Sequence, residues 1–523
     1  MPNHLEPSRR KALKLLAGVP MLPIASSATA SLLAVGCGGG GGDDVRFASA
    51  TFTSMAAPTL ANAAAMATTT VGSTLNIQLS DNSVQSYALA YHPFFITGDL
   101  VSDGKGGKIL SGGYVDINNQ PILDKTVSGS ERQFFSDSPD GTSLLTVPNA
   151  KVDGVKGKPV FAVVQFEYTT WAQDGKTDMY GKLPSPIAVL TLDQDQTTGK
   201  LSLVKYHNVD TSKVHGLWIT CGASLSPWGT HLSSEEYEPD AFSIASNTMF
   251  KAYSQNLYGD ETKANPYHYG HMPEVFVNAD GTASIKKHYC MGRISHELVQ
   301  VMPDQRTALM GDDATNSAYF VFVADKEKDL SSGSLYVAKV GAGFSIDPAS
   351  GSAAALTWIK LGSATSAEIE QLANTLKPTD IMSVVSKDPQ DATFTKIVAN
   401  GKTEWIKINP GMDKAAAFLE THRYAAYKGA SAGFTKMEGT TVNAKDKVAY
   451  SALQNCQDSM VAGHAANVPG NGISIPKALK AGVVMALNLK GGQKDTAGAA
   501  INSEWMPVDT RALLAGEDIA ADA

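Results

Sequence analysis

Three stretches of the chain repeat one local pattern, in which a short aliphatic run is followed by a polar turn and a second short run. The first stretch covers residues 187–204, and the pattern returns over residues 274–285 and 334–361. Runs of this length separated by Asp, Asn, Gly and Pro predict β-hairpins. Because the hairpins recur at long, irregular intervals with large insertions, the pattern favours an all-β fold, a β-propeller with long inserted loops, over a sandwich.

Signals for helices are few. Thr365 and Glu368 form a capping box ahead of an apolar stretch, and residues 413–427 are predicted to form a helix that Gly429 ends. The sequence therefore predicts an all-β chain with a few short helices.

The N-terminus carries the pattern of an export signal. Arg9 and Arg10 precede an uncharged, moderately apolar stretch over residues 15–35, which is typical of the twin-arginine route. Cys37 ends a segment that resembles a lipoprotein box, so we expect it to be lipidated; cleavage after Ala30 and free secretion is the alternative. The expected location is the periplasm or the outer cell surface, reached through the twin-arginine translocation machinery.

The export signal predicts a division of the chain into three parts. Residues 1–36 are predicted to be the signal, residues 37–75 a flexible Gly/Ala/Thr-rich tether, and residues 76–523 a β-propeller domain. No long apolar run follows residue 45, so we expect membrane contact only through the N-terminal lipid.

The overall charge limits the possible ligands. The chain has 43 Lys and Arg against 51 Asp and Glu, a net charge of −8, and therefore no basic footprint for nucleic acid. An anionic ligand would need a local positive centre, which bound metal ions can supply.

The densest group of reactive side chains lies over residues 221–240. Cys221, His231, Glu235 and Glu236 fall within this stretch. A soft thiolate favours iron, zinc or copper, whereas carboxylates favour calcium, so the combination predicts a mixed metal site. A buried cysteine beside a solvated acidic loop is the alternative that spacing alone leaves open.

Two further clusters carry acids. Glu297 ends one motif and is followed, after a predicted strand, by the pair Asp312 and Asp313. Lys436 and Glu438 lie in a Gly-rich segment, where Lys436 could neutralise a phosphate as a point charge. An acidic turn and a surface lysine are the simpler interpretations of these residues.

Taken together, the three clusters resemble the PhoX family of exported alkaline phosphatases. The resemblance extends from about Ser136 to the C-terminus, and residues 228–236 are its most specific part. It implies a β-propeller that hydrolyses small phosphomonoesters with a pair of Fe(III) ions, bridged by a cysteine thiolate and an oxo group, and with Ca²⁺ around them. Relatives usually continue beyond the point at which this chain stops, Ala523, so two alternatives are open: a fragment that lacks the last propeller strands, or a chain without them for which the implied activity is weaker.

The resemblance also implies roles for individual residues. Cys221 corresponds to the iron-bridging cysteine, and Lys436 and Glu438 to catalytic positions, with Lys436 in place of the usual Arg. Gln165 stands within a run that has Asn-His-Glu-Tyr in many members, which places a polar contact there in doubt. The implied metal ligands are Cys221, Glu235, Glu236, Glu297, Asp312, Asp313 and Glu438.

The predicted function is therefore an exported, metal-dependent phosphomonoesterase. One alternative is a catalytically silent surface propeller that binds calcium for stability. Another is a calcium-dependent lactonase or phosphotriesterase, which would not need Cys221.

Overall fold

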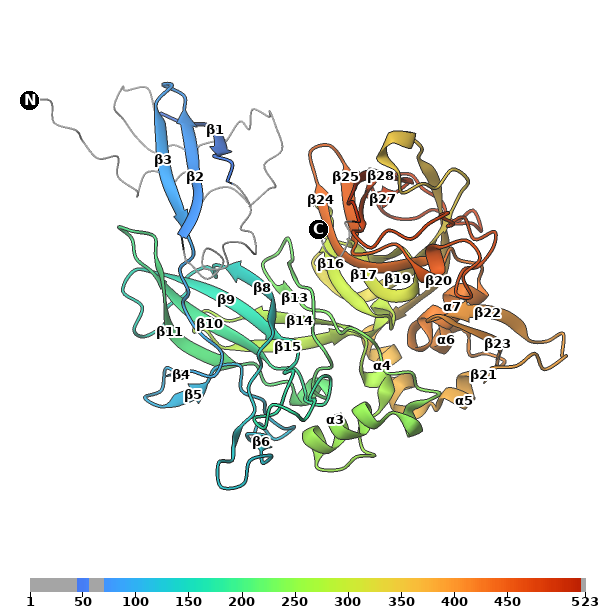
Figure 1. Ribbon diagram of the computed structural model, residues 1–523, viewed down its shortest axis with the longest axis horizontal. Helices are drawn as coiled ribbons and strands as arrows, with labels where there is room; N and C mark the ends of the chain where they lie inside the picture. Colours follow the sequence, from blue (N-terminus) through green and yellow to red (C-terminus); the bar gives the residue numbers. More distant parts are fainter. Residues whose placement is uncertain (1–44, 56–69, 519–523) are drawn as a thin grey trace, which may run out of the picture. The chain divides into compact units, whose positions relative to one another are not determined.

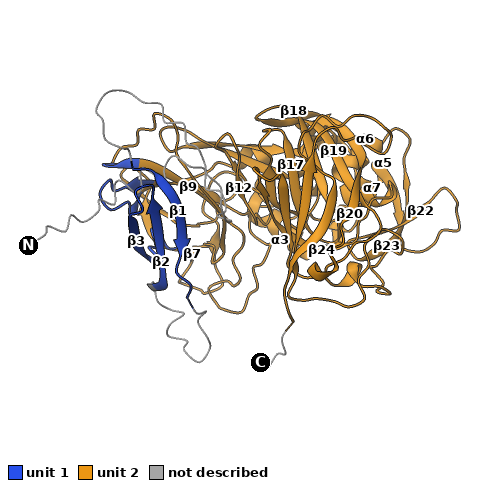
Figure 2. Cartoon of the chain, turned by 90° about the horizontal axis from the view of Figure 1, so that it is seen from above, with its two compact units in different colours: residues 1–96, 155–158, 192–203 blue, residues 97–154, 159–191, 204–523 orange. Residues whose placement is uncertain are grey.

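The computed structural model describes residues 45–55 and 70–518, and these residues form two compact units (Figures 1 and 2). The first unit contains the described residues up to 96 together with 155–158 and 192–203; the second contains residues 97–154, 159–191 and those from 204 onwards. The predicted signal, with Arg9, Arg10 and Cys37, lies outside the described residues. Among residues 45–55 and 70–518, no helix has the length and apolar character needed to cross a membrane.

The first unit contains a three-stranded antiparallel sheet in the order β1-β2-β3, with β1 Phe47–Phe52, β2 Thr70–Leu79 and β3 Val84–Ala90. The predicted tether over residues 37–75 is corrected here, because β1 and the start of β2 lie inside it. The physical reason is that β2 buries Ile77 and Leu79 on one face by alternation, which fixes a strand whose backbone β1 can pair with.

Two four-stranded sheets contain the hairpins expected over residues 187–204 and 274–285, and the third, expected over residues 334–361, lies in a larger sheet. One has the order β11-β10-β9-β8 and the other the order β12-β13-β14-β15. Their strands are β8 Pro139–Leu145, β9 Lys158–Phe166, β10 Ile187–Gln194, β11 Leu201–Asn208, β12 Ser224–Leu225, β13 His231–Leu232, β14 Met272–Val277 and β15 Ala283–His288. Four-stranded sheets joined by long connections are the units of a propeller-like fold, so the all-β prediction is confirmed.

Eight strands of the C-terminal half close into an antiparallel ring that the hairpin pattern does not predict. The ring runs β17-β18-β19-β20-β28-β26-β25-β24 and returns to β17, with β16 as a further partner of β17. These strands are β16 His296–Val301, β17 Thr307–Ser317, β18 Phe320–Lys326, β19 Asp329–Val340, β20 Ala354–Thr365, β24 Phe434–Asn443, β25 Val448–Leu453, β26 Val483–Lys490 and β28 Asp509–Ala515. The closure joins segments more than a hundred residues apart in the chain.

Alternation along the ring strands divides the apolar core in two. Phe320 and Phe322 of β18 point into one buried cluster, and Val321 and Val323 point into the other. The first cluster also takes side chains from the helices that cover this face, and the second takes side chains from β24, β25 and β26.

The helices are short and lie mainly against the first cluster. They are α3 Thr248–Tyr258, α4 Ser366–Thr375, α5 Pro378–Ile381, α6 Asp413–Leu419 and α7 Thr421–Tyr427. The capping box of Thr365 and Glu368 is present at α4. The helix predicted over 413–427 is interrupted at Glu420, whose backbone leaves the helical region and separates α6 from α7.

The remaining strands are short and form small separate sheets or, for one of them, pair with β26. They are β4 Leu100–Ser102 with β5 Lys108–Leu110, β6 Leu123–Asp124 with β7 Arg132–Gln133, the sheet of β21 Met382–Val385, β23 Lys402–Ile408 and β22 Thr395–Ala399, and β27 Met506–Pro507 beside β26.

Candidate metal-binding active site

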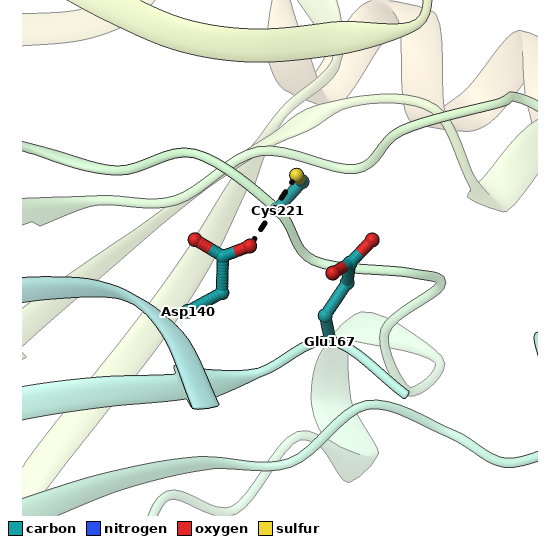
Figure 3. A group of neighbouring side chains, drawn as sticks. All are labelled: Asp140, Glu167 and Cys221. Carbon is teal, nitrogen blue, oxygen red and sulfur yellow. Dashed lines mark hydrogen bonds between the residues drawn. The ribbon is translucent and has the colours of Figure 1, made fainter. Parts of the chain in front are cut away.

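The thiol of Cys221 is shared by two groups of acidic side chains in the second unit. One group adds Asp140 and Glu167, and the other adds Glu236 and Glu297; within each group one potential ligand atom per residue lies within 4.8 Å of the others. Figure 3 shows the first group, in which Cys221 Sγ lies 3.5 Å from Asp140 Oδ2. The thiol of Cys221 is therefore the potential ligand atom that the two groups have in common.

Strand pairing brings the first group together. Pro139 on β8 pairs with Phe166 on β9 in antiparallel register, so Asp140, one residue further into β8, and Glu167, one residue beyond β9, are diagonal neighbours on either side of this pair. Backbone contacts then bring in the third member, because the N–H of Gly141 donates to the carbonyl oxygen of Cys221 over 3.3 Å.

Two glycines allow this close approach. The N–H of Gly222 donates to Glu297 Oε2 at 3.0 Å, and a Cβ on Gly222 would lie 2.6 Å from that oxygen and 2.8 Å from Leu298 N. A Cβ on Gly141 would lie 2.8 Å from the carbonyl oxygen of Cys221. Any side chain at either position would therefore move the thiol or one of its acidic neighbours.

The Gln165 side chain holds the backbone of Cys221 in place by hydrogen bonding. Its Nε2 donates to the carbonyl oxygen of Cys221, and its Oε1 lies 3.0 Å from His231 Nε2. His231 is completed by Ser143 Oγ, 2.9 Å from Nδ1, and burial lowers the pKa of His231 to about 3. Gln165 thus connects the backbone of Cys221 to His231, and His231 is a neutral part of the scaffold.

The two groups together form the acidic cluster, which consists of Cys221, Asp140, Glu167, Glu236 and Glu297. This cluster holds more negative charge than the neighbouring cations of the protein neutralise. Burial, followed by neighbouring carboxylates, raises the pKa of Glu236 to about 11, that of Glu297 to about 8 and that of Glu167 to about 7. Burial and four nearby acids also raise the pKa of the Cys221 thiol. Among the described residues, the only ion pairs at this cluster involve Lys436. Bound cations would let these groups ionise together.

Lys436 lies beside the acidic cluster, and hydrogen bonds hold its side chain in position. Its Nζ donates to Tyr237 Oη at 2.6 Å and to Asp313 Oδ2, and lies 3.9 Å from Glu438 Oε1. Asp313 is buried, and its second oxygen, Oδ1, has no hydrogen-bond partner among the described residues. An unpartnered carboxylate oxygen beside Glu236 is a further acceptor that fits a cation.

The structure takes Glu235 out of the predicted ligand set. Glu235 Oε1 accepts from Lys287 Nζ at 2.9 Å and from Trp218 N, and Oε2 accepts from the backbone N–H groups of Gly270 and His271. Thr220 and Glu235 form an isolated β-bridge, and successive side chains of an extended backbone point to opposite sides. Glu236 therefore faces the cluster, while Glu235 is a buried structural anion.

Asp312 is corrected in the same way. It neighbours Asp313 on β17, so the two side chains point to opposite faces. Asp312 accepts from His422 Nε2 at 2.9 and 3.0 Å, and His422 Nδ1 lies 2.8 Å from Glu238. Burial alone would lower the pKa of His422, but the two carboxylates outweigh it and raise the pKa to about 10, so the three residues form a buried ion chain.

The sequence assigned no role to Asp140, Glu167 or Tyr237. Asp140 and Glu167 each lie at the end of a strand that the resemblance covers, which is the signal that could have identified them. The remaining predicted residues, Lys436 and Glu438, both lie on β24, and their side chains approach each other, with Lys436 Nζ 3.9 Å from Glu438 Oε1.

A cavity of about 460 Å³ adjoins the cluster at Lys436 and Asp313. It is lined by Tyr237, Glu238, Ser295, Asp313, Ala314, Thr315, Asn400, Thr435, Lys436, Asn455, Gln457 and Asp458.

Comparison with known proteins identified one matching family. The family model described as alkaline phosphatase PhoX matches residues 193–473, a range that contains Cys221, Glu236, Glu297, Lys436 and Glu438. A comparison with curated proteins gave no match.

The solved structures that resemble this chain include the following two. One is Pseudomonas fluorescens PhoX in complex with vanadate, a transition state analogue, with 17% identity, 80% of this chain and 74% of that chain covered, and a TM-score of 0.45. The other is the Pseudomonas aeruginosa periplasmic gluconolactonase PpgL, with 12% identity, 77% and 98% covered, and a TM-score of 0.21.

Proposed function

The chain belongs to the PhoX family of alkaline phosphatases, enzymes that hydrolyse phosphoric monoesters, and we propose that its reaction takes place at iron and calcium ions held around Cys221. The observation that carries this proposal is the sharing of one thiol by two acidic groups. A lone structural cysteine would not need carboxylates on both sides, and burial beside four of them is unfavourable without cations.

The donor set fits the two kinds of ion. Cys221 with Glu236 and Glu297 would hold one ion, and Cys221 with Asp140 and Glu167 the second. The Cys221 thiolate would be a ligand for iron, and the surrounding carboxylate oxygens are the ligands that Ca²⁺ favours. When bound, these ions would polarise the phosphate oxygens and lower the pKa of bound water.

Lys436 would bind the substrate phosphate from the protein side. Asp313 and Tyr237 hold its Nζ in place and occupy two of its three donor directions, which leaves one for a phosphate oxygen. An ammonium group offers a point charge rather than the bidentate fork of Arg, so Lys436 would balance charge without fixing the orientation of the phosphate. Glu438, 3.9 Å from Nζ, is placed to accept a proton or to bind a cation at the same face.

The test is a cysteine series in purified, metal-loaded protein, assayed with phenyl phosphate. We expect Cys221→Ser to lose at least 100-fold in kcat and most of the bound metal, because a serine alkoxide is a far more basic ligand that forms poorly near neutral pH. Cys290→Ser and Cys456→Ser are matched controls, since both cysteines are buried outside the two groups. Full activity of Cys221→Ser with normal metal content would contradict the proposal.

We also propose export of the folded enzyme through the twin-arginine route. The support is the Arg9-Arg10 pair ahead of an uncharged stretch. Replacing both arginines by Lys should retain the protein in the cytoplasm, and Cys37→Ala should release it from the membrane fraction. Unchanged export of the double variant would refute the signal assignment.

A further inference from the structure

The cavity beside Lys436 has a direct connection to the proposed metal cluster. Lys436 and Asp313 line the cavity, and Lys436 Nζ also lies 3.9 Å from Glu438 Oε1. On the other side, Asp313 contributes to the raised pKa of Glu236, so the two carboxyl groups are neighbours. A phosphate held between the cluster and Lys436 would therefore direct its ester oxygen, and the alcohol attached to it, toward the cavity.

The cavity wall offers mostly neutral hydrogen-bonding groups. Asn455 and Gln457 supply two amides, and Thr315 and Thr435 lie beside them. Asn455 Nδ2 donates to Gln454 Oε1 at 3.5 Å, and among the described residues the Gln457 side chain forms no hydrogen bond. The Gln457 amide is therefore free to pair with a hydroxyl group of a ligand in the cavity.

The wall is unsuited to apolar or strongly anionic alcohols. Ala314 is the only small apolar residue among the described lining residues, so an alkyl chain would gain little from burial. Lys436 is the only cation among those residues, and it is already paired with Asp313. Asp458 adds a further negative charge at an exposed position, so a second phosphate group would meet repulsion.

We infer that this cavity is the leaving-group pocket and that the preferred substrates are monophosphates of neutral polyhydroxylated alcohols, such as sugars. This inference rests on the proposed function, because it assumes that the phosphate is bound at the neighbouring cluster. The pocket has the capacity to hold a hexose, and its amides match hydroxyl groups that both donate and accept.

The first test compares glucose 6-phosphate with phenyl phosphate in wild type, Asn455→Leu and Gln457→Leu. Each variant removes a hydrogen-bonding amide at similar volume, so we expect the ratio of kcat/KM for glucose 6-phosphate to that for phenyl phosphate to fall about threefold to tenfold. Gln371→Leu is the matched control, because Gln371 is exposed on α4 and does not line the cavity. An unchanged ratio in both pocket variants would overturn the inference.

The charge of the pocket gives a second test. Asp458→Lys should raise kcat/KM for fructose 1,6-bisphosphate at least threefold relative to phenyl phosphate, because it replaces repulsion by attraction. A wild type that already prefers the bisphosphate to glucose 6-phosphate would contradict the inference.

Binding of the free alcohol separates this inference from the proposed function. We expect saturation-transfer NMR of the full chain to detect millimolar glucose in wild type and a signal at least halved in Asn455→Leu. Absence of this signal in wild type would refute the assignment of the cavity as the leaving-group pocket, even if phenyl phosphate is hydrolysed. Glucose binding in a protein that hydrolyses no monoester would instead refute the proposed function and leave a sugar-binding site.

Discussion

Replacing Gly222 by Ala is expected to damage the cluster with a single methyl group. The new Cβ would lie 2.6 Å from Glu297 Oε2 and 2.8 Å from Leu298 N, whereas non-bonded heavy atoms pack at about 3.5 Å or more. Either Glu297 or the backbone must therefore move by roughly 1 Å. Overpacking of this kind costs about 1–3 kcal/mol of unfolding free energy.

The effect on catalysis should exceed the effect on stability. A misplacement of about 1 Å in a reacting site can lower the rate about 100-fold, and the lost Glu297 contact should also lower metal content. The assays are denaturant melts, elemental analysis and hydrolysis of phenyl phosphate. Gly72→Ala is the control, because the nearest atom to its Cβ is 3.7 Å away. Wild-type activity and metal content in Gly222→Ala would refute the close-packing argument.

Three further predictions follow from the same contacts. Lys436→Arg should keep the fold and equal or exceed the wild-type kcat/KM for phenyl phosphate, since Arg restores a bidentate fork; a loss above tenfold would show that the site requires lysine. Glu235→Gln should lower the unfolding free energy by about 3–5 kcal/mol in denaturant melts, because it leaves Lys287 buried without its counter-ion; a stable variant with reduced metal would return Glu235 to the ligand set. In chelator-treated protein, the pKa is about 8 for Glu297 and about 7 for Glu167, against an ordinary value of 4.5. The folded state therefore binds more protons than the unfolded state between about pH 4.5 and pH 8. Thermal melts should therefore show stability falling as the pH rises from about 4.5 to 8, and a rise over that range would contradict the charge argument.

Local patterns were enough to predict the hairpins. The segments 187–204 and 274–285 contain their own turn residues, so strand, turn and pairing partner are neighbours in the chain. The closed ring was not predictable in this way, because the pairing of Asp312 with Met437 joins residues that no local signal connects. The sheet of β1 and β2 was missed because an Ala/Thr-rich composition also suits a linker.

The site was predicted in part for a similar reason. Cys221, Glu236 and Glu297 stand in motifs that can be recognised in the sequence. Asp140 and Glu167 join them only through the register of β8 and β9.

Adjacent acids could not be told apart by composition. The pairs are Glu235 with Glu236 and Asp312 with Asp313. In each pair the extended backbone points one side chain to the acidic cluster and the other to a buried cation. The register of the strand decides which of the two acids faces the cluster.

Iron X-ray absorption spectroscopy of the protein folded in its native host tests most directly whether Cys221 bridges two ions. We predict sulfur in the first coordination shell together with scattering from a second metal atom, and loss of the sulfur contribution in Cys221→Ser. An iron shell of oxygen and nitrogen alone in wild type, or a protein that holds calcium without iron, would contradict the thiolate-bridged centre.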